Sequence, residues 1–118
     1  MFVVERVYKA PDPSDGRRIL VDRLWPRGLK KESAQIDDWL KELAPSDALR
    51  RWFDHRPERW VEFQAKYRAE LASPAVSESL KRLRALGRKG AVTLLYAARD
   101  EIENNAQVLK RVLTKSAK

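Results

Sequence analysis

Two apolar segments of the chain end abruptly in charged and aromatic residues. The aliphatic run at residues 19–21 passes directly into charge and then into a turn that contains Pro26 and Gly28. The apolar residues 91–98 are likewise followed at once by an arginine and an aspartate. A buried strand that ends in this way commonly presents a ligand site in α/β proteins. The candidates at these two strand ends are Asp22, Arg23, Trp25, Arg27, Tyr96, Arg99 and Asp100.

Arginine dominates these candidates, which indicates a ligand with negative charge. Its guanidinium group binds carboxylates and phosphates through two parallel hydrogen bonds. We expect Arg23, Arg27 and Arg99 to hold a small anionic ligand, such as a nucleotide or a phosphorylated metabolite. Trp25 and Tyr96 would line the pocket.

Asp22, Asp100 and His55 are the candidates for moving protons. His55 is the only histidine, and an imidazole is suited to general acid or base work near neutral pH. In the structural alternative, His55 caps a helix end or donates to a backbone carbonyl. The alternative for Asp22 and its neighbour Arg23 is a network in which each pairs with another charge, such as Arg99 or Asp100.

The alternation of side chains along a strand separates the candidates of the first strand end. Successive residues of a strand point to opposite faces of the sheet. Arg23 and Trp25 should therefore share one face, and Asp22 should point to the other. We expect Arg23 to clamp the ligand beside Trp25, with Arg27 reaching in from the turn.

Three segments have the composition of strands, at residues 2–8, 19–25 and 91–98. The connection at residues 9–18 is rich in turn-forming residues and short enough for a hairpin, so we expect the first two strands to pair antiparallel. Helices separate the second strand from the third. A right-handed crossover would make these two strands parallel and would bring both charged ends to the same edge of the sheet.

Apolar periodicity, caps and prolines predict the helices. The apolar stripe at positions 36, 39, 40 and 43 predicts a helix that Ser33 caps and Pro45 ends. Ser46 is a suitable N-cap for a short second helix, and prolines at positions 57 and 74 suit the first turns of two more. Gly87 is a suitable residue just after the fourth helix. Asp100 or Asn104 should cap a last helix that buries Ile102, Ala106, Leu109 and Leu113.

This order of elements predicts the α/β class. We expect a small sheet of three or four strands, mixed or parallel, packed by about five helices. Residues 1–118 should form one domain, with a polar tail that frays from about residue 114.

Composition excludes several kinds of chemistry. The 118 residues include no cysteine and one histidine, which excludes disulfides, thiolate nucleophiles and iron–sulfur clusters. A zinc site would need carboxylates for most of its ligands, so we expect no metal. No phosphate loop, dinucleotide fingerprint or hydrolase motif identifies a cofactor. Because no apolar run approaches the roughly 20 residues of a membrane span, we expect a soluble cytoplasmic protein with no membrane partner.

The net charge of +8 supports an alternative function, that of a nucleic-acid-binding module. The basic runs lie at positions 50–51, 81–84 and 88–89. Aromatic residues do not interleave with these runs as they do in single-strand platforms, and acidic residues intersperse with basic ones as on any solvated surface. The nucleic-acid function therefore ranks second, and a partner-binding adaptor without a ligand is a third alternative.

Four short segments of the sequence resemble those of a known family, the YeaO-like proteins of bacteria. The segments are VDRLWPRG at 21–28, LAPS at 43–46, LRRWFDH at 49–55 and TLLYAARD at 93–100. The resemblance runs from about Val7 to Leu113 and implies a small α/β domain of bacterial or archaeal cytoplasm. It brings no established activity, substrate or catalytic residue. The chain departs from the family's pattern at residues 103–105, where Glu-Asn-Asn stands in place of a frequent His beside Asn, which leaves His55 as the sole imidazole.

Overall fold

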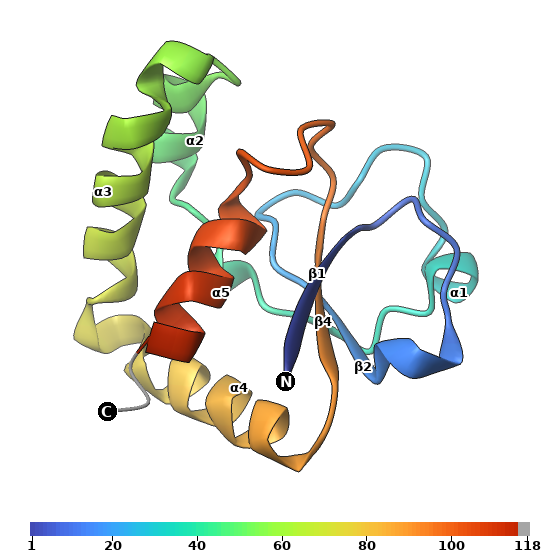
Figure 1. Ribbon diagram of the computed structural model, residues 1–118. Helices are drawn as coiled ribbons and strands as arrows, with labels where there is room; N and C mark the ends of the chain where they lie inside the picture. The colour runs from blue at the N-terminus through green and yellow to red at the C-terminus, as the bar shows by residue number, and fades with distance from the viewer. Residues whose placement is uncertain (116–118) are drawn as a thin grey trace.

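Four parallel strands form one sheet in the computed structural model, which describes residues 1–115. The strands are β1 (Phe2–Arg6), β2 (Arg17–Leu20), β3 (Asp38–Trp39) and β4 (Val92–Tyr96). Their order across the sheet is β1-β4-β2-β3, of which Figure 1 labels β1, β4 and β2. This arrangement confirms the predicted α/β class and the small sheet, and among the described residues five α-helices accompany it.

The helices divide between the two faces of the sheet. The single short helix α1 lies on one face, and the other four cover the opposite face (Figure 1). Short 3₁₀ turns η1 to η4 (Pro13–Asp15, Lys41–Leu43, Pro57–Arg59 and Pro74–Val76) start or connect these elements. The α-helices are α1 (Lys31–Ala34), α2 (Asp47–Phe53), α3 (Trp60–Leu71), α4 (Ser77–Lys89) and α5 (Asn105–Lys115).

Each face of the sheet has its own apolar core. The larger core packs Ile19 and Leu94 of the sheet against α3, α4 and α5. The smaller core packs Leu20 and Leu95 against α1 and the loops around it. Alternate residues of β2 and β4 thus enter opposite cores, as the period of a strand requires. All five residues of β4 are buried, which confirms its prediction as a central strand.

The predicted antiparallel pairing of the first two strands is wrong. β1 and β2 both pair with β4, parallel to it and on opposite sides of it. The connection at residues 7–16 runs back along the sheet and ends in the turn η1 before β2 begins. Ten residues of extended chain reach roughly 33 Å, which is ample for this return path without a helix. A short connection therefore did not require a hairpin.

The predicted helix over positions 36–43 is also wrong. Gln35 adopts a left-handed conformation (φ 50°) and ends α1, so Ser33 lies inside that helix and does not cap it. The chain then pairs with β2 through β3, where Leu40 N–H donates to the Leu20 carbonyl (2.9 Å). Ile36 enters the smaller core and Leu43 the larger one. The helical spacing of these apolar residues arose from a chain that crosses between two cores.

The later helices follow their predicted signals with two corrections. Ser46 caps α2 through a hydrogen bond from Leu49 N–H, and Pro57 and Pro74 each begin a 3₁₀ turn that leads into the next helix. Gly87 lies inside α4, where a side chain would collide with the ring of Phe2.

The second correction concerns the segment that leads into α5. Asn104 accepts a hydrogen bond from Gln107 N–H at the start of this helix, whereas Asp100 accepts from the backbone of the preceding turn. Ile102 lies in that turn and is 72% exposed, so its predicted burial is wrong. α5 ends at Lys115, and the rest of the predicted polar tail lies outside the described residues. No helix in residues 1–115 combines the length and apolar character that a membrane span needs.

Candidate functional site

The carboxyl ends of β2 and β4 form a switch point in the sheet. After β2 the chain turns to α1 on one face, and after β4 it turns to α5 on the other face. Two neighbouring parallel strands whose connections leave on opposite faces open a crevice between their carboxyl ends, which is the usual place for a ligand in such sheets. Asp22 and Ala97 lie on the two sides of this switch point, just beyond their strands.

Side chains replace the backbone hydrogen bonds at this edge of the sheet. Val21 N–H still donates to the Leu95 carbonyl (3.1 Å), and a parallel ladder would continue from Ala97 N–H to the Val21 carbonyl. Ala97 N–H instead donates to Oδ2 of Asp22 (2.9 Å), and Nδ2 of Asn105 donates to the Val21 carbonyl (2.9 Å). The carboxylate of Asp22 is therefore fixed at the position where the sheet stops.

Burial dominates the electrostatics of Asp22. Loss of hydration raises the pKa of this carboxyl, against the opposing effects of the Ala97 N–H group, the Asn105 side chain and the charge of His55. Tyr67 of α3 lies in the same environment. Its hydroxyl donates to the Leu43 carbonyl, and burial together with the negative charges of Asp22 and Glu70 raises its pKa. Asp22 is thus a carboxyl that takes up a proton more readily than usual.

His55 reaches this edge from the turn between α2 and α3. Asp54 and His55 both adopt left-handed backbone conformations, with φ values of 49° and 52°. Two successive non-glycine residues in this region are costly and persist only where their surroundings hold them. The His55 ring lies 6.3 Å from that of Phe53, and its positive charge acts on Asp22. The charge of His55 therefore acts on Asp22, which we predicted separately as a proton carrier.

Arg23 also lies on the α2 side of the sheet edge. Its Nε donates to the Pro45 carbonyl (2.9 Å), just before Ser46 caps α2. Ser46 is held in turn by Glu70, whose carboxylate accepts from the Ser46 backbone N–H (2.8 Å) and hydroxyl (2.5 Å). The two terminal guanidinium nitrogens of Arg23 have no hydrogen-bond partner in the part of the chain that the structure describes.

Trp25 belongs to the other face of the sheet. Its Nε1 donates to the Leu29 carbonyl (2.8 Å), and its ring meets that of Trp39 edge-on at 5.3 Å, against the smaller core. Arg23 and Trp25 therefore do not share a face, and the predicted alternation is wrong. The physical reason is that β2 ends at Leu20, so the period of a strand no longer governs these residues.

The remaining candidates are dispersed. Tyr96 is buried beside a groove of about 620 Å³ along β1, which does not include Asp22 among its lining residues. Asp100 is exposed, and the backbone N–H groups of Glu103 and Ile102 lower its pKa, which identifies a turn-forming carboxylate. Arg27 and Arg99 are exposed, and no hydrogen bond or ion pair of their side chains is found within residues 1–115.

The alternative of an ion-pair network at this edge does not describe the contacts. Asp22 and Arg23 each bind a backbone group, and neither pairs with Arg99 or Asp100 among the described residues. Two members of the site were missed by sequence reasoning, Tyr67 and Asn105. The sequence offered a signal only for Asn105, as half of the Asn-Asn pair that precedes the last predicted apolar stripe. Residues 1–115 contain no cluster of side chains suited to a metal ion.

Comparisons with known proteins assign the chain to a family. A family model described as the inactive DUF488-N3 subclade matches residues 1–118. The chain belongs to this YeaO-like family. The uncharacterized protein YeaO of Escherichia coli (strain K12) is 45% identical over 105 residues, which cover 89% of this chain and 90% of that protein. The uncharacterized protein Rv3073c of Mycobacterium tuberculosis (strain ATCC 25618 / H37Rv) is 43% identical over 110 residues, 93% of this chain and 91% of the relative. No solved structure matches significantly. The expected YeaO-like membership is confirmed, and these relatives carry no named activity.

Proposed function

We propose that this YeaO-like protein is a ligand-binding domain whose crevice between the ends of β2 and β4 takes a small anion. The observation that carries the proposal is the state of Asp22. Its carboxyl stands at the switch point of the sheet with a raised pKa and faces the charge of His55. An anion that approaches would favour the protonated form of Asp22, so binding and proton uptake would be coupled.

The charges around the crevice favour an anion once Asp22 is neutral. Within the described residues, Arg23 keeps its two terminal guanidinium nitrogens free of hydrogen bonds on the α2 side, where its charge also helps to lower the pKa of Asp47, and the charge of His55 acts on Asp22. Tyr67 is already engaged with a carbonyl, and Glu70 is engaged with Ser46, so neither competes directly for the ligand. A phosphate or carboxylate group matches the planar donors of Arg23 best.

The other predicted site residues have unequal parts in this proposal. Arg99 follows β4 and Arg27 lies in the turn after β2, and their exposed side chains would add long-range attraction for the anion. Hydrogen bonds hold Trp25 and Asp100 elsewhere, and Tyr96 lines the groove along β1. These three residues therefore take no part in the proposed site. The description of the matching family as inactive favours binding over turnover, so Asp22 and His55 serve here to couple a proton to the ligand.

Sulfate is the simplest probe, because it resembles phosphate and does not titrate near neutral pH. We expect it to shift the backbone amide resonances of Asp22, His55 and Ala97 in a saturable way. The variants R23Q and H55A should each weaken sulfate binding by about tenfold, equivalent to about 1.4 kcal/mol. R88A is the matched control, since Arg88 is an exposed cation on α4 away from the crevice. Equal weakening by R88A would reduce the effect to net charge and overturn the proposal.

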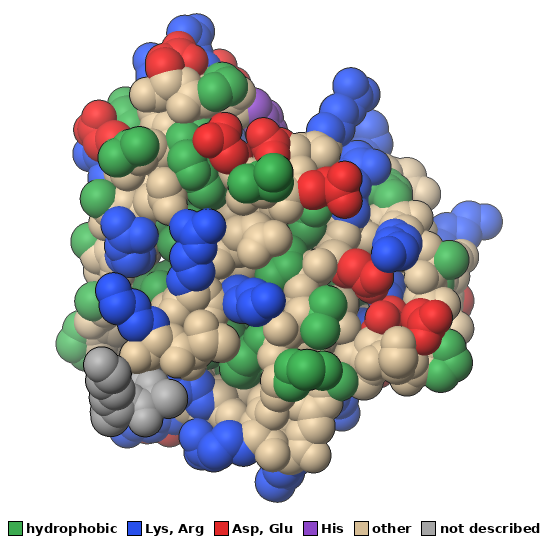
Figure 2. Space-filling model, viewed as in Figure 1, with side chains coloured by type: hydrophobic (Ala, Val, Ile, Leu, Met, Phe, Trp, Pro, Cys, Tyr) green, Lys and Arg blue, Asp and Glu red, His purple; other side chains and the backbone are tan. Residues whose placement is uncertain are grey.

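One observation keeps nucleic acid as a second candidate ligand. On the face shown in Figure 2, Lys and Arg side chains gather over the lower parts of the helices, whereas most acidic side chains lie above or beside them. A labelled single-stranded RNA or duplex DNA would bind there through phosphate contacts. Its affinity would fall by several orders of magnitude between about 50 mM and about 200 mM salt. Absence of any anisotropy change at the lower salt concentration would eliminate this function.

A further inference from the structure

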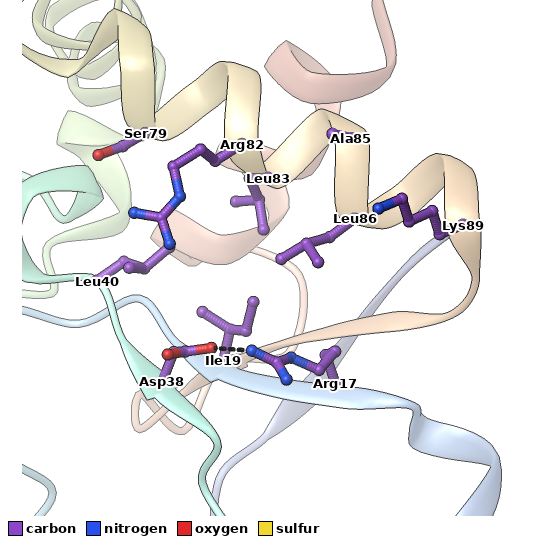
Figure 3. Close-up of a pocket in the computed structure, with 10 residues that line it drawn as sticks. All are labelled: Arg17, Ile19, Asp38, Leu40, Ser79, Arg82, Leu83, Ala85, Leu86 and Lys89. Carbon is purple, nitrogen blue, oxygen red and sulfur yellow. Dashed lines mark hydrogen bonds and ion pairs between the residues drawn. The ribbon is translucent and has the colours of Figure 1, made fainter.

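A cavity of about 210 Å³ lies between α4 and the β2–β3 side of the sheet (Figure 3). It exists because β3 is only two residues long and α4 presents the small side chain of Ala85 at this point. The sheet and the helix therefore do not close completely over one another. Apolar side chains form most of the inner surface, namely Ile19, Leu40, Leu83 and Leu86.

Positive charge surrounds this apolar interior. Arg82 and Lys89 extend from α4 over the cavity, and Arg17 reaches it from the start of β2 (Figure 3). Arg17 forms an ion pair with Asp38 (2.8 Å), which is the only acidic residue that lines the cavity. Arg82 and Lys89 have no ion pair within residues 1–115. Two uncompensated cations thus flank an apolar space.

We infer that this cavity binds a small amphipathic anion, with an apolar body held by the leucines and an acidic group held by Arg82 and Lys89. Cavities for drug-sized ligands begin at roughly 300 Å³, so the body should be no larger than one aromatic ring or a short branched chain. A carboxylate or a phosphate monoester supplies the acidic group. A purely apolar ligand would leave the two cations without a partner, and a bare inorganic anion would leave the apolar surface in water.

Acidic neighbours define where the charged group sits. Asp38 is paired with Arg17 at one end of the cavity opening. At the other end, the Ser79 hydroxyl donates to the Glu42 carboxylate (2.8 Å). An anion is repelled from both places and is directed to the α4 side between them. This site is independent of the crevice at Asp22, because Arg17 begins β2 whereas Asp22 follows its end. Failure of one proposal leaves the other standing.

Phenyl phosphate is a suitable probe, with benzyl alcohol as its neutral analogue and inorganic phosphate as the bare anion. We expect phenyl phosphate to shift the methyl resonances of Ile19, Leu83 and Leu86 in a saturable titration. Its affinity should exceed that of either partial analogue by at least about tenfold.

Two variants test the geometry. A85W should fill the cavity and abolish the titration, and R82E should weaken it by about tenfold or more without touching the core. R88A is again the matched control on the same helix, outside the lining, and should bind as the wild type does. Thermal melts identify any variant that fails to fold, and R82E alone then decides, because Arg82 is exposed. Unchanged binding in R82E, or equal binding of benzyl alcohol, would overturn the inference.

Discussion

The two ends of β2 hold charged residues in different ways. At the amino end, charges compensate one another: buried Arg18 pairs with Asp15 (2.5 Å) and lies 3.9 Å from Glu5, and exposed Arg17 pairs with Asp38. At the carboxyl end, Asp22 and Arg23 bind backbone groups and form no ion pair with each other. Both ends are ordered, yet the charged side chains Asp22 and Arg23 at the carboxyl end have no ion-pair partner among the described residues.

This difference separates a structural set of charges from a responsive one. A buried carboxylate with an arginine partner stays ionised, and removal of the partner is strongly destabilising. The carboxylate of Asp22 accepts from N–H groups and has no ion-pair partner among the described residues. Burial raises its pKa, so its protonation can change with pH or with a ligand. From the sequence, Asp15, Arg17 and Arg18 were assigned to the connection at residues 9–18, and the pairs that they form were not identified.

The largest effect should come from breaking the amino-end pair. R18M leaves Asp15 buried without its partner and should lower the free energy of unfolding by about 3–5 kcal/mol. R17M removes an exposed pair and should cost at most about 1 kcal/mol. Urea denaturation of the two variants beside the wild type measures both values. Similar small losses for R18M and R17M would show that the amino end is not held by its buried pair.

At the carboxyl end the expected loss is smaller. D22A removes the acceptor of Ala97 N–H and leaves that half-buried group unpaired, which should cost about 1–3 kcal/mol. D22N retains an oxygen acceptor and removes the charge that is costly to bury, so it should be clearly more stable than D22A. Urea denaturation at neutral pH checks the order of the two variants. The structural role of the Asp22 carboxyl would be refuted if both were equally stable.

The smallest effect concerns the backbone that carries His55. H55G removes the imidazole and relieves a left-handed backbone conformation, so it should stabilise the fold by up to about 1 kcal/mol. A69G, at an exposed position inside α3, should instead destabilise it by about 1 kcal/mol. Thermal unfolding compares the two glycine variants. A loss of stability in H55G as large as in A69G would indicate that His55 contributes to packing rather than being held at a cost.

Local signals in the sequence predicted much of the fold. The serine and proline signals at positions 46, 57, 73 and 74 act within one helical turn, and they were read correctly. The pairing of β1 and β2 was misjudged because it depends on β4, which lies far along the chain. The helix at 36–43 was misjudged because this segment pairs with β2 and crosses between two cores. Its insertion between β1 and β2 and the two cores it creates have no local signature.

The candidate site was predicted only in part, again because some of its contacts join residues that lie far apart in the chain. The unusual charge at Asp22 and Arg23 and the single imidazole of His55 are visible in the sequence, and the structure brings them to one edge. The bond from Asn105 to the Val21 carbonyl joins residues 84 positions apart. Trp25 was misplaced because a strand period was extended beyond Leu20, where the strand had already ended.

The coupling of anion binding to protonation at Asp22 is the central claim, and the pH dependence of sulfate affinity tests it most directly. The raised pKa of Asp22 means that its negative charge is lost more readily as the pH falls, so the sulfate affinity of the wild type should rise as the pH is lowered from about 8 to about 5. D22N, already neutral, should bind sulfate more tightly than the wild type at pH 8 and show a shallower rise. Superimposable curves for D22N and the wild type would contradict the account.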